Sequence, residues 1–138
     1  MKNQKKNYMF HPKVMKNYYS NPDLLRIHVT SEYTKLDFGY VAKDIYINGG
    51  WIRIAPETFI ENKITKQRYT MVNAENIPLA PMHHYFETKK DWRYFSLFFP
   101  PMPQKDCIIN VIEIEDGTAN NFNYYNIELK IAEAIEIL

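Results

Sequence analysis

The chain has 138 residues, of which 46% are hydrophobic and 15% aromatic, so it can bury a core of its own as one domain and is not a disordered polypeptide. Its 17 basic and 16 acidic side chains give a formal net charge of +1, which argues against an overall field for nucleic acid or an anionic membrane. A single cysteine excludes a disulfide framework within the chain.

The first 22 residues differ in charge from the rest. They hold five lysines and no acidic residue, so we predict a basic, partly flexible arm over residues 1–22 and a single domain over residues 23–138. Aromatic side chains interleave with these lysines and could stack nucleic-acid bases. The aromatic residues of this segment are Tyr8, Phe10, Tyr18 and Tyr19.

No apolar run approaches the length of a membrane-spanning helix, so we expect no membrane span. Pro12 and Lys13 interrupt the apolar stretch that a signal peptide would need after its lysines. As written, the chain is therefore expected in the cytoplasm, and a leader removed from this sequence would instead make it an exported protein.

From residue 23 onward, most segments alternate apolar and polar residues with the period of a β-strand. The alternation is clearest at 25–29 and 36–40, and Asn48-Gly49-Gly50 is typical of a hairpin turn. Further strands are predicted at 45–47, 51–54, 58–60, 68–72, 94–99, 108–114 and 125–130, with a short helical turn at 132–135.

The run Tyr94–Phe99 is almost wholly apolar, so we predict a central strand covered on both faces, with Ser96 as a hydrogen-bonded hydroxyl rather than a nucleophile. Strands do not alternate with long helices, which argues against a parallel α/β sheet. The sequence therefore predicts an all-β fold, an antiparallel β-sandwich of about seven to nine strands.

Two glutamates two residues apart are the strongest carboxylate pattern. Glu113 and Glu115 on one strand face would lie about 7 Å apart, within the range of glycosidase carboxylates. Catalysis requires the two to sit in different environments, whereas we expect both to be solvated. The pair keeps open the alternative of a domain that binds or hydrolyses glycans.

Metal and thiol chemistry have weaker signals, and we expect no cofactor. His83 and His84 would point to opposite faces of a strand, so only a loop would turn both toward one metal. Glu113 with Asp116 is a further weak candidate, for calcium. Cys107 follows Asp106, whose charge raises the pKa of the thiol, which indicates a structural cysteine.

Aromatic residues are the remaining resource for binding, because an aromatic ring on a sheet face or in a cleft forms a platform for sugars and peptides. Aromatic side chains are equally good strand and core residues. The candidates for ligand contact are Trp51, Trp92, Tyr124 and Tyr125.

Several stretches in one order resemble a group of small, uncharacterised immunoglobulin-like β-sandwich domains that recur in Bacteroidetes-type bacteria. The likeness spans about residues 24–130 and implies an immunoglobulin-like sandwich, in relatives that commonly look exported. It implies no activity and carries over no catalytic residue. The stretches are 50–60, Tyr69, 74–79, 95–103, 112–113 and 122–127.

No nucleophile with a neighbouring base, metal spacing or phosphate loop stands out, so the sequence favours a non-catalytic binding or protein-interaction module. We expect the partner to be a protein or a glycan rather than nucleic acid. The alternatives are a glycan-binding or glycan-hydrolysing sandwich that uses its aromatics with Glu113 and Glu115, and a nucleic-acid accessory protein that uses the N-terminal arm.

Overall fold

The computed structural model describes residues 6–13, 21–43, 48–115 and 121–137. Within these ranges the chain contains no α-helix, and so no helix long and apolar enough to span a membrane. The elements are β1 (Asn7–Phe10), β2 (Asp23–Val29), β3 (Thr34–Val41), β4 (Trp51–Ile52), β5 (Phe59–Asn62), β6 (Arg68–Thr70), β7 (Asn73–Glu75), β8 (His84–Tyr85), β9 (Trp92–Phe99), β10 (Cys107–Ile112), β11 (Tyr124–Leu129), the 3₁₀ turn η1 (Ile131–Glu133) and β12 (Ile135–Ile137).

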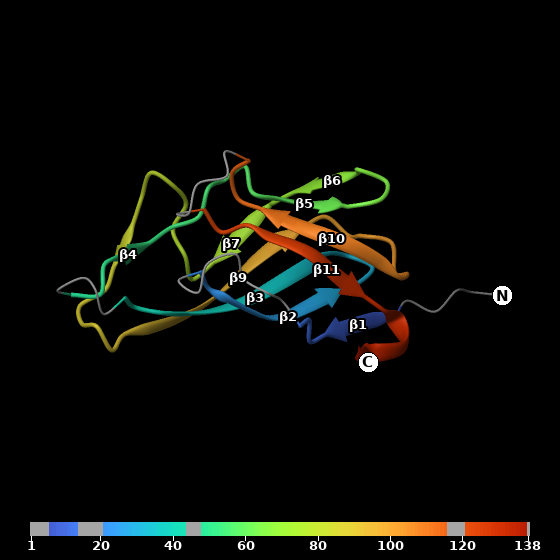
Figure 1. The fold of residues 1–138 in the computed structure, drawn as a ribbon, viewed down its shortest axis with the longest axis horizontal. Helices are drawn as coiled ribbons and strands as arrows, with labels where there is room; N and C mark the ends of the chain where they lie inside the picture. The colour runs from blue at the N-terminus through green and yellow to red at the C-terminus, as the bar shows by residue number, and fades with distance from the viewer. Residues whose placement is uncertain (1–5, 14–20, 44–47, 116–120, 138) are drawn as a thin grey trace.

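The strands form two main antiparallel sheets and one small one (Figure 1). The larger sheet has the order β12-β1-β2-β3-β9-β7, the second has the order β11-β10-β5-β6, and β4 and β8 form the small sheet. Phe38 of β3 meets Tyr124 of β11 with ring centroids 5.7 Å apart, so the two main sheets share one core. This all-β architecture of antiparallel sheets is consistent with a β-sandwich.

Inward-facing residues of both main sheets fill that core, as the alternation predicts. On β9, Phe95, Leu97 and Phe99 are buried, which confirms the prediction for the apolar run. Burial of such side chains is worth about 1.5–3 kcal/mol each, and it is the main force that holds the sheets together. The fully buried members are Ile27, Leu36, Phe38, Ile52, Ile54, Ile60, Leu97, Phe99, Ile109, Tyr124, Ile127 and Leu129.

The opposite face of β9 is open, contrary to the prediction that this strand is covered on both faces. Tyr94 is 60% exposed, and Ser96 and Phe98 are half-buried. The sequence is apolar on both sides because aromatic residues also suit an exposed sheet surface, so the composition alone did not distinguish the two faces.

A bulge in β2 changes which residues face the core. The pairing with β3 shifts between Leu24 and Arg26, so that Leu24 lies opposite Phe38 and is buried while Leu25 is 38% exposed. The prediction that Leu25 continues the inward row of Ile27 is therefore wrong, because one extra residue in a bulge reverses the alternation beyond it.

A second irregularity occurs in β11. Asn126 has a φ of 58°, its backbone N–H donates to Oδ1 of Asn110, and the register with β10 shifts between Ile109 and Val111. Consequently Tyr124 rather than Tyr125 joins Ile127 inside, which corrects the expected strand face.

Asn126→Ala is expected to lower the free energy of unfolding by about 1–2 kcal/mol more than Asn126→Gly, because only glycine adopts this left-handed backbone without strain. Both variants lose the contact from Lys63 Nζ to the Asn126 side chain, so the difference between their free energies of unfolding measures the cost of the left-handed backbone at residue 126. Urea denaturation measures it, and equal stability of the two variants would show that the bulge is not strained.

Part of the predicted N-terminal arm belongs to the domain. β1 pairs with β2 on one side and with β12 on the other, and Phe10 is buried in the core. Residues 7–10 are therefore a strand rather than a flexible arm. Tyr8 and Phe10 alternate with Met9 and point toward the core, a pattern that the prediction from the lysines did not take into account.

The C-terminal helical turn is present, one residue earlier than predicted, as η1. The chain then continues into β12, which the sequence did not predict. Gly49 and Gly50 have the positive φ values expected of the turn before β4, while the strand predicted at 45–47 lies outside the described residues.

Candidate functional site

The outer face of the six-stranded sheet carries an ordered set of side chains. Strands β3 and β9 pair without interruption, so residues that point away from the core meet in rows across the sheet. One end of this face is apolar and aromatic, and its centre is charged. The outward pairs, from the apolar end inward, are Val41 with Trp92, Gly39 with Tyr94, Asp37 with Ser96 and Lys35 with Phe98.

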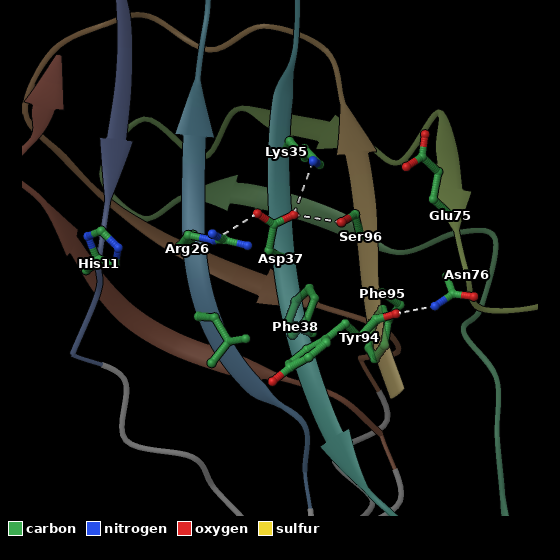
Figure 2. Close-up of a pocket in the computed structure, with 11 residues that line it drawn as sticks. His11, Arg26, Lys35, Asp37, Phe38, Glu75, Asn76, Tyr94, Phe95 and Ser96 are labelled. Atoms are coloured by element: carbon green, nitrogen blue, oxygen red, sulfur yellow. Dashed lines mark hydrogen bonds and ion pairs between the residues drawn. The ribbon is translucent and has the colours of Figure 1, made fainter. Parts of the chain in front are cut away.

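A groove of about 550 Å³ lies on this face, which we call the outer-face groove (Figure 2). Its volume falls within the range of roughly 300–1,000 Å³ that small-molecule sites occupy. The lining residues come from β2, β3, β7 and β9 and from the residues that follow β1 and β7: His11, Leu25, Arg26, Lys35, Asp37, Phe38, Glu75, Asn76, Tyr94, Phe95 and Ser96.

Asp37 is the centre of the polar half of the groove. Its Oδ1 accepts a 2.6 Å hydrogen bond from Ser96 Oγ, and its Oδ2 lies 3.0 Å from His28 Nε2 and 3.2 Å from Arg26 Nε. Lys35 Nζ lies 3.5 Å from Oδ1. The carboxylate is nearly buried beneath these donors, so it fixes the side chains of three neighbouring strands.

The surroundings of Asp37 also set its acidity. Burial alone would raise the pKa, but the hydrogen bond from Ser96 and the charges of Lys35 and His28 outweigh burial and hold the pKa of Asp37 below its ordinary value of 3.8. The ionised form therefore stabilises the fold above pH 3.8, and this contribution is lost as the pH falls through the lowered pKa.

Ser96→Ala is expected to raise the pKa of Asp37 toward 3.8, because the hydroxyl donates to the ionised carboxylate. Carbon-13 NMR of the Asp37 carboxyl as a function of pH measures this change. Ser31→Ala alters an exposed serine and should leave the titration unchanged. A midpoint at or above 3.8 in the unsubstituted protein would contradict the assignment.

Tyr94 forms the aromatic side of the groove. Its ring lies over Gly39, where a Cβ would come within 3.1 Å of Tyr94 Cε1 and 3.3 Å of Leu25 Cδ1. Glycine therefore gives the ring room to lie on the sheet. Trp92 continues this surface, with its ring centroid 4.9 Å from that of Tyr94 and the planes inclined by 59°.

Glu75 and Asn76, at the end of β7, line the groove on the side opposite His11. Asn76, at a φ of 65°, donates from Nδ2 to the carbonyl oxygen of Tyr94, and Arg93 Nε donates to the carbonyl oxygen of Asn76. The first of these contacts holds the amide of Asn76 beside the backbone of Tyr94, as Figure 2 shows, and Glu75 precedes Asn76 in the chain.

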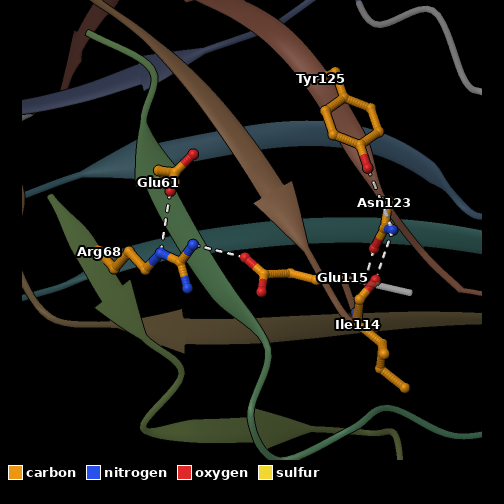
Figure 3. Close-up of polar contacts among 6 residues, drawn as sticks. All are labelled: Glu61, Arg68, Ile114, Glu115, Asn123 and Tyr125. Carbon is orange, nitrogen blue, oxygen red and sulfur yellow. Dashed lines mark hydrogen bonds and ion pairs between the residues drawn. The ribbon is translucent and has the colours of Figure 1, made fainter. Parts of the chain in front are cut away.

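The four aromatic candidates from the sequence do not come together. Trp92 extends the outer-face groove, whereas Trp51 lies in the separate β4-β8 sheet, where Arg53 stacks on its ring at 5.0 Å. Tyr124 is fully buried and its hydroxyl donates to the carbonyl oxygen of Pro22, so it belongs to the core and offers no ligand surface. Tyr125 lies in the other main sheet, near Asn123 (Figure 3).

The expectation that Glu113 is solvated is wrong. Its side chain is 7% exposed, with Oε2 accepting from the backbone N–H of Ala55 and Oε1 from that of Phe122, both at 2.9 Å. Burial raises the pKa of Glu113, against the opposing effect of these two donors. The carboxylate thereby joins the loop before β5 to the loop before β11.

Glu115 has a different environment. Its Oε1 accepts from Arg68 Nη2 at 2.6 Å, and Arg68 also donates to Glu61 on the surface of the second sheet (Figure 3). Glu113 and Glu115 are therefore engaged separately, one by backbone amides and one by a guanidinium, and they do not face each other across the outer-face groove.

The weak metal candidates are also dispersed. His83 contacts the Trp51 ring and Arg53, while His84 in β8 contacts Arg93. Among the described residues, no group of three or more histidine, cysteine or acidic side chains could hold a metal ion, and Asp116 lies outside them. Burial, with the charge of Asp106, raises the pKa of the Cys107 thiol in the direction that its sequence neighbour predicts.

The aromatic residues of the N-terminal segment have structural roles where they are described. Phe10 is in the core and Tyr8 packs against it, while Tyr18 and Tyr19 lie outside the described residues. A buried ring cannot stack a base, so Phe10 is not part of a nucleic-acid surface.

Sequence reasoning missed most of the outer-face groove. Asp37 and Gly39 stand between the inward residues of a strand, and that alternation places both on the outer face. A glycine inside a strand also marks a close approach of another group, which the ring of Tyr94 supplies. The contributions of Glu75 and Asn76 depend on β7 pairing with β9, which no local pattern predicts.

No protein-family model, curated protein or solved structure matches this chain.

Proposed function

We propose that this domain is a non-catalytic binding module whose ligand occupies the outer-face groove. One observation carries this proposal: the exposed ring of Tyr94 and the ion-pair cluster around Asp37 line the same open groove. A fixed polar cluster beside an apolar ring gives a ligand both orientation and contact area.

The contacts of Asp37 favour binding over acid–base chemistry. Its two oxygens accept from Ser96, His28 and Arg26, and its pKa is lowered, so it is a poor base at neutral pH. The separate engagement of Glu113 and Glu115 supports the same reading, since a glycosidase needs two carboxyl groups facing one bond.

We further propose that the sandwich is immunoglobulin-like. The order β2-β3-β9-β7 follows that of strands A, B, E and D in the immunoglobulin fold, and β11-β10-β5 follows G, F and C. With β6 as an added strand beside C, the chain order also runs from A to G. This correspondence supports the resemblance of residues 24–130 to small immunoglobulin-like domains.

Chemical-shift mapping tests the binding function with probes of three classes: the neutral hexasaccharides cellohexaose and maltohexaose, tetraglutamate and tetralysine peptides, and a thymidine hexanucleotide. At least one class should shift the backbone amide signals of Arg26, Asp37 and Tyr94. Absence of shifts with every probe, or shifts centred on the β4-β8 sheet, would overturn the proposal.

A further inference from the structure

The charges that line the outer-face groove are balanced. The lining holds the cations Arg26 and Lys35 and the anions Asp37 and Glu75, so its formal charges sum to zero when His11 is neutral. An anionic ligand would approach Asp37 and Glu75, and a cationic ligand would approach Arg26 and Lys35, so each would meet like charge inside the groove. The lining therefore fits an uncharged ligand best.

The polar groups at the rim include both donors and acceptors. Arg26 uses Nε for Asp37, and its Nη atoms have no hydrogen-bond partner among the described residues. Asn76 uses Nδ2 for the backbone of Tyr94, and within the same ranges neither its amide oxygen nor the carboxylate of Glu75 accepts a hydrogen bond. A hydroxyl group donates and accepts at once, so a polyhydroxylated ligand can use both kinds of group.

The aromatic side of the groove supplies a surface for a flat apolar face. Tyr94 and Trp92 are 60% and 63% exposed, and they adjoin each other on the sheet. Sugar rings have such a face, formed by their C–H groups, while their hydroxyls project sideways. This arrangement would place a sugar on Tyr94 with its hydroxyls toward Asn76 and the Asp37 cluster.

The length of the groove fits a chain of sugars rather than one. Its lining runs from His11, after β1, to Glu75 in β7, which crosses four strand spacings of about 4.8 Å, or about 19 Å. Resting on the binding function proposed above, we infer that the ligand is a neutral oligosaccharide that lies across strands β2, β3 and β9, with Tyr94 as its stacking platform.

Titration calorimetry on the full chain tests this inference with cellohexaose, maltohexaose, xylohexaose and mannohexaose. At least one should bind, and Tyr94→Ala should weaken that binding about tenfold or more, as loss of a stacking aromatic anchor does. Tyr85→Ala is the matched control, because Tyr85 is a 67% exposed tyrosine in the separate β4-β8 sheet, and it should leave the affinity within about twofold.

The salt dependence separates an uncharged ligand from a charged one. Binding of the hexasaccharide should change less than about twofold between about 0.1 M and about 1 M salt, where the screening length falls from about 10 Å to about 3 Å. Failure of all four sugars to bind, or equal affinity of Tyr94→Ala and the unsubstituted chain, overturns the inference. If a peptide or oligonucleotide binds in the groove instead, the binding function stands and only the sugar assignment fails.

Discussion

Replacement of Glu113 by alanine is expected to lower the free energy of unfolding by about 2–6 kcal/mol. The carboxylate accepts from the backbone N–H groups of Ala55 and Phe122 in a buried position. Its removal leaves both donors without a partner, and each buried unsatisfied group costs about 1–3 kcal/mol. Urea denaturation of the full chain at neutral pH measures the difference.

Two variants make this result specific. Glu113→Gln keeps one acceptor oxygen and should lose about half as much stability, because its amide nitrogen cannot accept from the second N–H. Glu115→Ala removes an exposed ion pair with Arg68 and should change the stability by less than about 0.5 kcal/mol. Equal losses at Glu113 and Glu115 would contradict the structural role of the buried carboxylate.

Leu97→Ala is expected to cost about 2–5 kcal/mol, the range found for large-to-small changes in packed cores. Leu97 is almost fully buried in β9, where it faces Leu36 of β3 and Ala74 of β7 across the sheet. The cavity would form where the central strands meet the core, and the backbone pairing on both sides limits how far the sheet can relax.

Ile64→Ala is the control for the loss of aliphatic volume. Ile64 is an exposed side chain in the connection between β5 and β6, so this change should alter the stability by less than about 0.5 kcal/mol. A change of less than about 0.5 kcal/mol for Leu97→Ala would mean that the inner and outer faces of β9 are assigned the wrong way round.

Most strands could be predicted because their inward residues alternate. The patterns at Leu36, Phe38 and Tyr40, and at Phe95, Leu97 and Phe99, are local and match the burial found in the fold. The alternation predicts the wrong face where a bulge adds one residue to a strand, because the amino-acid composition does not show where a bulge occurs. In β11 the asparagine at the left-handed position is a weak sign of such a bulge.

Long-range partners explain the other differences from the sequence predictions. The residues around Glu113 predict a surface position, but in the fold Ala55, 58 positions earlier in the chain, donates a backbone hydrogen bond to its buried carboxylate. The lysines around β1 predict a charged arm, but in the fold β1 pairs with β2 along one edge and with β12 along the other. Neither pairing follows from the residues near Glu113 or near Phe10.

The outer-face groove was hidden for the same reason. The sequence indicates that aromatic side chains are available, and it includes Trp92 among the candidates, but the groove combines the outward halves of strands that are far apart in the chain. Asp37 and Ser96, 59 residues apart, form its shortest hydrogen bond between two side chains. The strand pairing thus determines which polar groups stand beside Tyr94.

The most direct test of the outer-face groove is an isotope-filtered NMR measurement of contacts between a bound hexasaccharide and the aromatic protons of the protein. Our account predicts nuclear Overhauser effects from sugar C–H protons to the ring of Tyr94, with further contacts to Trp92 and none to Trp51 or Tyr85. Contacts to Trp51 or Tyr85 in place of Tyr94 would contradict it.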